Sequence, residues 1–210
     1  PSIPRLLNIQ QKKVEGCEFG IVPAKSEDGI QVMSLNLLID DEEKPVIWRG
    51  PIISGTVKQF WTDVFWGDLD YLIIDMPPGT GDVALTVMQS IPISGMVMVS
   101  TPQEMVSMIV AKAVNMARTM EVPVIGIIEN MSYLKCPDCD KKIRMFEDNN
   151  LQDYLGRMDL DLLGELPMTR EIANISRGQF EEYTVDVSEA LDQIASKIIA
   201  FAEQRVEKEN

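Results

Sequence analysis

The sequence has no histidine among its 210 residues. This absence excludes a Ser-His-Asp triad, a Cys-His nucleophile pair and every zinc site that is built with histidine. Only three cysteines are present, and an odd number without an export signal argues against a framework of disulfide bonds. No apolar run approaches the ~20 residues that a bilayer-spanning helix needs, and the first residues lack the apolar core of a signal peptide. The sequence therefore predicts a cytoplasmic protein with no membrane partner.

Basic residues are scarce as well. Nineteen lysines and arginines stand against 33 acidic residues, which gives a formal net charge of −14. Such a chain repels phosphate backbones, which argues against sequence-independent binding of nucleic acid. A hydrophobic fraction of 45% in 210 residues can form a packed core without disulfide bonds. We therefore expect one globular domain.

Apolar, strand-like segments alternate with segments of helical periodicity along the chain. This alternation predicts an α/β fold, a mostly parallel sheet with helices on both faces. Ligands of such folds bind at the carboxyl ends of the strands, so residues that directly follow a strand are the candidates for function. We expect strands within 30–39 and at 71–74, 95–100 and 122–128, and helices over 106–120 and 191–202.

The first candidate is the string Tyr-Leu-Ile-Ile-Asp-Met-Pro-Pro-Gly-Thr-Gly-Asp at 71–82. Asp75 ends an expected buried strand, and the Pro-Pro-Gly that follows stops regular structure. An acid in this place suits a magnesium ion in a nucleotide site, because it can hold the waters of the ion. The glycines allow backbone N–H groups to approach phosphate oxygens. Asp75 as a cap for a helix that begins near Asp82 is an equally acceptable interpretation of the spacing.

A second candidate, Asn130, follows the expected strand at 122–128. A side-chain amide can donate and accept hydrogen bonds together, which is what an adenine edge requires. Asparagine is also common in turns for purely structural reasons. The position alone leaves both interpretations open.

The third candidate is the Cys-Pro-Asp-Cys motif of Cys136 and Cys139. Two thiolates at this spacing supply half of a four-cysteine site for zinc or for an iron–sulfur cluster. Since Cys17 would still leave the site one ligand short, we expect two chains to contribute one pair each, with the metal on the two-fold axis of a homodimer. The alternatives are a redox pair, which needs its first cysteine at a helix N-terminus, and two ordinary free thiols.

These three elements, in this order, resemble the Mrp/ApbC family of iron–sulfur cluster carrier proteins, which are P-loop NTPases of the MinD/ParA type. The resemblance runs from residue 1 to about 202. It rests on residues 1–5, 48–51, 66–67, 70–71, 75–82, 129–132, the cysteine pair and 163–167.

The resemblance implies an ATPase homodimer that holds a 4Fe–4S cluster between paired cysteine motifs and transfers it to apo iron–sulfur proteins. The cysteines would lie in an inserted loop around 131–147. Asp75 would be the Walker B aspartate near Mg²⁺, and Gly79 would lie in the switch that senses the γ-phosphate of ATP. Asn130 would face the adenine, and the segment after Pro167 would pack over the base.

The sequence departs from this family most clearly in its lack of a P-loop. The nearest approach to Gly-x-x-x-x-Gly-Lys-Ser/Thr is Gly50–Thr56, which has threonine where lysine is required. We therefore expect residues 1–210 to be a partial, single P-loop NTPase domain from a longer protein, without its first strand, P-loop and helix, and impaired alone. We also expect poor stability, because strand edges and apolar helix faces would be exposed.

Two smaller departures affect the cysteine and base regions. Glu147–Asn150 stands where the family usually has a glycine-rich stretch, and Met168–Arg170 replaces a more acidic pattern after Pro167. Two other functions therefore stay open beside the cluster carrier. One is a MinD/ParA-type ATPase switch whose cysteine pair holds structural zinc or is idle. The other is a non-enzymatic fragment or scaffold.

Overall fold

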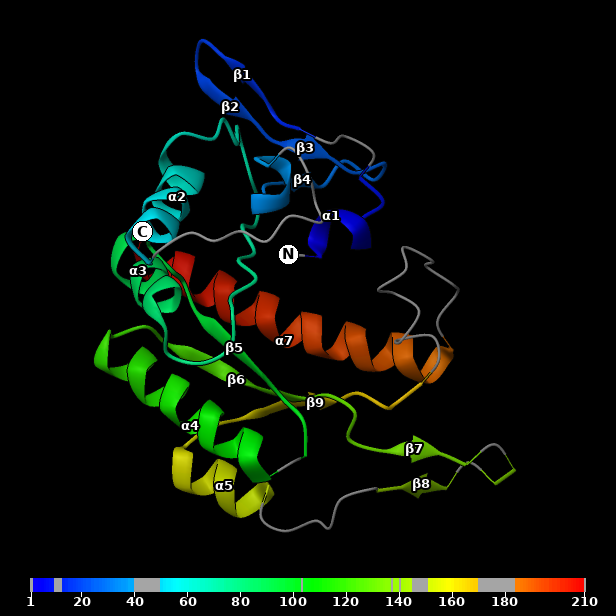
Figure 1. Cartoon of the computed structure of the whole chain (residues 1–210). Helices are drawn as coiled ribbons and strands as arrows, with labels where there is room; N and C mark the ends of the chain where they lie inside the picture. The colour runs from blue at the N-terminus through cyan, green and yellow to red at the C-terminus, as the bar shows by residue number, and fades with distance from the viewer. Residues whose placement is uncertain are drawn as a thin grey trace. The chain divides into compact units, whose positions relative to one another are not determined.

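A computed structural model describes residues 2–9, 13–39, 50–102, 104–136, 138–139, 141–144, 151–169 and 184–209. The described residues form two compact units. The first contains those of 1–77 and 81–91, and the second contains those of 78–80, 92–173 and 182–210. Figure 1 labels the elements, and each unit is described by itself. No helix in the described ranges is long and apolar enough to cross a membrane.

The first unit begins with short elements. Helix α1 (Ile3–Leu6) is followed by two antiparallel strand pairs and by the 3-10 helix η1 (Leu35–Leu37). The expected strand within 30–39 is wrong beyond residue 32, because the chain turns there and enters η1. The strand pairs are β1 (Glu15–Cys17) with β2 (Gly20–Val22) and β3 (Ala24–Lys25) with β4 (Gln31–Val32).

Two helices complete the first unit. Helix α2 (Gly50–Thr62) packs against α3 (Asp82–Ser90), and the hydroxyl of Thr86 donates a 2.9 Å hydrogen bond to Ser54 Oγ between them. Helix α3 begins directly after Gly81 and carries Asp82 in its first turn, where the helix dipole favours a carboxylate. Its inner face buries Ala84, Val87 and Met88.

The segment 71–74 is not a strand, so this expectation is wrong. Residues 65–81 contain neither helix nor strand, and all four side chains of 71–74 are exposed, Ile73 to 90%. A β-strand is held by hydrogen bonds to a neighbouring strand, and no strand in the described residues pairs with this segment. An apolar composition of this kind is typical of a strand inside a sheet. Residues 71–74 have this composition but no neighbouring strand among the described residues.

The second unit is built around a parallel sheet with the strand order β5–β6–β9. Its strands are β5 (Met96–Ser100), β6 (Val124–Glu129) and β9 (Leu162–Glu165). Helix α4 (Glu104–Thr119) links β5 to β6, α5 (Leu151–Met158) precedes β9, and α7 (Val185–Glu209) follows it. Figure 1 shows α4 and α5 on one side of this sheet and α7 on the other. The expected strands at 95–100 and 122–128, both expected helices and the α/β arrangement are confirmed.

Close packing of α7 on β9 fixes the end of that strand. A Cβ added to Gly164 would lie 2.6 Å from a side-chain carbon of Ile194 on α7, so the helix approaches the strand at a distance that only glycine allows. Ile194, Val187 and the central Ile127 of β6 are buried in the same core. This packing positions Glu165, the residue after Gly164, at the carboxyl edge of the sheet.

Candidate functional site: the carboxyl edge of the sheet and the cysteine hairpin

The three parallel strands of the second unit end in register. Ser100 of β5 pairs with Glu129 of β6, and Glu129 pairs with Glu165 of β9. Hydrogen bonds join the residues that directly follow β6 and β9 to the neighbouring strand. The Asn130 N–H donates to the Ser100 carbonyl at 2.7 Å, and the Leu166 N–H donates to the Glu129 carbonyl at 2.9 Å. The sheet therefore has a well-ordered carboxyl edge, which is where the sequence analysis expects ligands.

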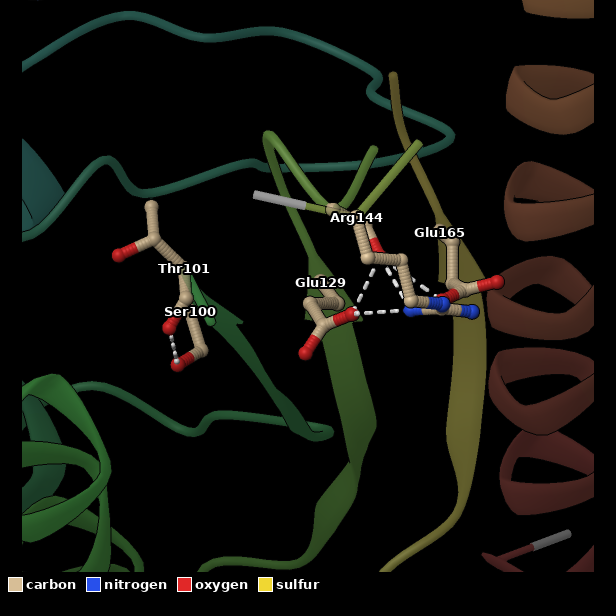
Figure 2. A network of polar contacts seen from close by, with 6 residues as sticks. Ser100, Thr101, Glu129, Arg144 and Glu165 are labelled. Carbon is tan, nitrogen blue, oxygen red and sulfur yellow. Dashed lines mark hydrogen bonds and ion pairs between the residues drawn. The ribbon is translucent and has the colours of Figure 1, made fainter. Parts of the chain in front are cut away.

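Two carboxylates and an arginine meet at this edge. Arg144 Nη1 lies 2.8 Å from Glu165 Oε1 and 3.8 Å from Glu129 Oε2. Figure 2 shows the Arg144 side chain reaching both glutamates, one at the end of β6 and one at the end of β9. The hydroxyl of Ser132 hydrogen-bonds with Glu129 and lies 2.8 Å from Glu165 Oε1. Arg144 Nη1 also donates to the Ser132 oxygen at 3.2 Å.

The two glutamates differ in acidity. Burial raises the pKa of Glu129 above its ordinary value, and the neighbouring Glu165 charge adds to this effect, against the hydrogen bond of Ser132 and the charge of Arg144. For Glu165 burial also opposes ionisation, but the hydrogen bonds from Ser132 and Arg144 and the charge of Arg144 outweigh it and lower the pKa. The Ser132 hydroxyl lies between the two carboxylates and has one proton to donate.

The sequence analysis assigned no role to this cluster. Glu129 and Glu165 lie within the motifs that carry the family resemblance. Glu129 directly follows the strand expected at 122–128, whereas no strand was expected at 162–165. The position of Glu129 directly after an expected strand could therefore have marked it as a candidate site residue. Arg144 gave no signal of its own, because only the fold of the chain between β6 and α5 brings its guanidinium back to the sheet.

Asn130 and Pro167, the two expected contacts for the adenine base, lie at the same edge. The Ser132 N–H donates to the Leu166 carbonyl at 2.9 Å, and the Met168 N–H donates to the Tyr133 carbonyl at 2.8 Å, so the segments after β6 and β9 are paired. The side-chain oxygen of Asn130 accepts from the Met131 N–H at 2.9 Å, as is typical of a turn. Pro167 is buried. The structure brings the segments that carry these two residues together, and their role toward a base stays a prediction.

Asp75 and Gly79 lie in the irregular stretch before α3. Asp75 is exposed. Gly79 has φ of +87°, a conformation that glycine adopts without strain, as a glycine-rich loop at a helix start requires. Their assignments to magnesium and to the γ-phosphate stay predictions.

Two motifs of the resemblance contact each other in the first unit. Asp82 Oδ2 lies 2.5 Å from the position that a Cβ on Gly50 would occupy. The start of α2 and the start of α3 are therefore adjacent. Trp48 and Arg49, which precede Gly50 in the same motif, lie outside the described residues.

Cys136 lies in a turn between two short antiparallel strands, β7 (Leu134–Lys135) and β8 (Lys142–Ile143). The Cys136 N–H donates to the Lys141 carbonyl at 3.0 Å, which closes this cysteine hairpin (residues 134–143). Cys136 is half-buried and Cys139 is exposed. Because Cys136 follows a strand, it lacks the helix N-terminus that the redox-pair alternative needs. The assignment of the cysteine pair to an inserted loop around 131–147 stays a prediction.

The described residues contain no group of three or more metal-ligating side chains. Cys17 is exposed in β1 of the first unit, so it and the cysteine hairpin belong to different units. The hairpin thus offers two thiols, which fits half of a tetrahedral site.

The base of the hairpin is attached to its surroundings by lysines as well. Lys135 of β7 forms an ion pair with Asp186 at the start of α7. The ammonium of Lys142 on β8 lies 4.2 Å from the centre of the Tyr133 ring, a cation–π contact. An open cavity of about 370 Å³ lies here, lined by both lysines, Asp186 and other residues of this region.

A parallel sheet with helices on both sides and joined loops at its carboxyl edge has the architecture of a nucleotide-binding α/β fold. The cysteine hairpin adds two thiols near this edge. The chain belongs to the ParA family of iron-transfer P-loop NTPases: the family model described as NUBPL iron-transfer P-loop NTPase matches residues 1–200. The family resemblance and the fold class predicted from the sequence are therefore confirmed.

Individual relatives agree with this assignment. An iron-sulfur cluster carrier protein of Clostridium perfringens is 46% identical over 194 residues, which cover 89% of this chain and 68% of the relative. An iron-sulfur cluster carrier protein of Methanocaldococcus jannaschii is 40% identical, with 99% of this chain and 72% of the relative covered. Among solved structures, a nucleotide-binding protein of Archaeoglobus fulgidus in complex with ADP matches with a TM-score of 0.74 and 37% identity, covering 90% of this chain and 74% of the other.

Proposed function

We propose that this protein carries an iron–sulfur cluster on Cys136 and Cys139 and delivers it to apo iron–sulfur proteins. The observation that carries the proposal is a pair of thiols, one half-buried and one exposed, in an anchored hairpin of a member of an iron-transfer family. The names of the Clostridium and Methanocaldococcus relatives support the carrier role. A cargo must be both held and released, and an exposed turn allows an acceptor to reach it.

The cluster proposed is 4Fe–4S, shared by two chains of a homodimer. Such a cluster takes about four cysteine thiolates, and each cysteine hairpin supplies two.

Nucleotide binding is the second part of the proposal. Support comes from the ADP-bound relative at 37% identity and from the joined segments that carry Asn130 and Pro167. In this account Asn130 and the segment after Pro167 hold the base, Asp75 holds the waters of Mg²⁺, and Gly79 senses the γ-phosphate. ATP hydrolysis then changes how tightly the cysteine hairpins hold the cluster. We place this activity in the cytoplasm, with residues 1–210 as one NTPase domain.

Anaerobic reconstitution with iron and sulfide tests the cluster site. Bound iron, labile sulfide and oligomeric mass are measured for the wild type and for the Cys136→Ser, Cys139→Ser double variant. The proposal predicts about four irons for each pair of chains in the wild type and none in the double variant. Cys17→Ser is the matched control and should load normally. Zinc in place of iron, or iron that survives the double substitution, would support the zinc-containing or idle-cysteine ATPase switch instead.

A further inference from the structure

The cysteine hairpin ends in a residue that binds the sheet. Arg144 directly follows β8 and forms its ion pairs with Glu129 and Glu165, at the ends of β6 and β9. Figure 2 shows this side chain joining the two strand ends. The strand that leaves the cysteine turn is therefore attached, within one residue, to the carboxyl edge that also carries Asn130.

The attachment has a clear electrostatic reason. Glu129 is 4% exposed, and without a cation it would share a hydroxyl and a small space with a second carboxylate. Arg144 supplies a positive charge to both groups and a hydrogen bond to Glu165 and Ser132. An arginine that moved away would leave two like charges close together, which opposes detachment of the hairpin. The hairpin base is thus held by charge, while its turn stays accessible.

We propose that Arg144 is a positioning residue that locks the cysteine hairpin to the ends of β6 and β9, and so couples the hold on the cluster to events at the carboxyl edge beside Asn130. This inference rests on the proposed function. Few contacts separate the cysteines from Asn130. The cysteine turn leads into β8, Arg144 follows β8 and pairs with Glu129, and Asn130 is the next residue along the backbone. A ligand at the edge that displaced Glu129 would loosen the lock, and by thermodynamic linkage a bound cluster would favour the locked edge to the same extent.

Release kinetics of the loaded protein test the coupling. Wild type, Arg144→Gln, Arg144→Lys and Lys141→Gln are reconstituted anaerobically, and the rate of iron loss to an excess of a chelator is measured. We expect Arg144→Gln to load the same amount of iron and to lose it about 5-fold faster or more, the lower end of typical coupling energies. Arg144→Lys should fall between this variant and the wild type, since lysine keeps the charge but not the fork of donors. Lys141→Gln removes the same charge from the hairpin turn and should behave as the wild type.

A second comparison assigns the effect to the glutamates. Glu165→Gln removes the negative charge that pairs with Arg144, so the double variant with Arg144→Gln should release iron no faster than Arg144→Gln alone. Independent, multiplying effects of the two substitutions would contradict the lock. Equal release rates for Arg144→Gln and wild type, or an equal acceleration by Lys141→Gln, would also overturn it.

Hydrogen exchange keeps this inference separate from the proposed function. In the metal-free chain, amides of 134–143 should exchange faster in Arg144→Gln than in wild type, and at the wild-type rate in Lys141→Gln. If the wild type binds no cluster but this difference appears, the proposed function fails and the lock stands. Unchanged exchange in the metal-free Arg144→Gln chain would reject the lock whatever the cluster result.

Discussion

The carboxylate of Asp82 lies against the backbone of Gly50, with Oδ2 only 2.5 Å from the place of a Cβ on residue 50. This contact joins the starts of α2 and α3, two places that the sequence marks with separate motifs. A Cβ at position 50 would displace this carboxylate, which is the end of a flexible side chain. The negative charge also lies where the positive end of the α2 dipole favours it.

Gly50→Ala should therefore lower the free energy of unfolding by about 1 kcal/mol, at the low end for overpacking because the Asp82 side chain can rotate away. Chemical denaturation measures the change. In an Asp82→Ala background the same glycine substitution should have almost no cost, since the atom it displaces is gone. An equal cost in both backgrounds would show that the contact is not the reason for glycine at this position.

A tighter contact exists at Gly164, where an added Cβ would lie 2.6 Å from Ile194. Gly164→Ala should destabilise the second unit by about 1–3 kcal/mol, because α7 must move away from β9. The matched control is Gly156→Ala in α5, where nothing lies within 4 Å of the added Cβ. That helical substitution should be neutral or stabilising by up to about 1 kcal/mol. Ile194→Val in the Gly164→Ala background should recover part of the loss. Denaturation curves of the wild type, the two glycine variants and this double variant compare these outcomes.

The acidities of Glu129 and Glu165 predict opposite pH effects. The pKa of Glu129 is raised by burial, so the folded state holds its proton longer than the unfolded state does, and this group's stabilising contribution is lost as pH rises above about 4.3. The pKa of Glu165 is lowered despite its burial, by the hydrogen bonds from Ser132 and Arg144, so its contribution is present above that pH and is lost as pH falls.

Glu129→Gln should accordingly gain stability relative to the wild type as pH rises from 4 to 7, and Glu165→Gln should lose it. Urea midpoints at several pH values measure both slopes. In the wild type the two glutamates change stability with pH in opposite directions, so their effects partly cancel. The variants are therefore more informative than the wild type. Relative slopes of the same sign for both variants would contradict the opposite pKa shifts of the two glutamates.

The exposed apolar run at 71–74 predicts self-association. Unpaired apolar segments with strand-like composition favour pairing with another chain, and Ile73 is 90% exposed. Ile73→Lys should reduce aggregation, followed by light scattering at rising concentration, with no loss of unfolding free energy. Ile52→Lys on α2 is the control, because Ile52 is 55% exposed but lies outside the run. Equal effects of the two substitutions would argue against the run as the contact.

The helices and strands of the second unit are predicted well, because the composition and periodicity of each segment indicate its structure. The strands that became β5 and β6 have apolar runs of the right length, and α4 and α7 have clear helical periodicity. The segment 71–74 has an equally strong apolar run, but a strand also needs a hydrogen-bonded neighbour, which composition does not reveal. An apolar run of strand length therefore predicts a strand correctly only where a neighbouring strand is present to pair with it.

The candidate site was predictable to the same degree. Cys136 and Cys139 form a local motif that the sequence shows directly, and in the structure Cys136 directly follows β7 of the hairpin. Asn130 and Pro167 were assigned through motifs, and their segments do meet. Arg144 could not be found in advance, because its ion pairs join positions far apart in the sequence and depend on the path of the hairpin.

Transfer of the cluster tests the central claim most directly. The reconstituted protein is mixed anaerobically with an apo 4Fe–4S protein in the presence of an excess of an iron chelator, and cluster formation in the acceptor is followed spectroscopically. The account predicts that the acceptor gains its cluster at the same rate with and without the chelator, and that the Cys136→Ser, Cys139→Ser variant transfers nothing. Abolition of transfer by the chelator would show release of free iron and would contradict a carrier function.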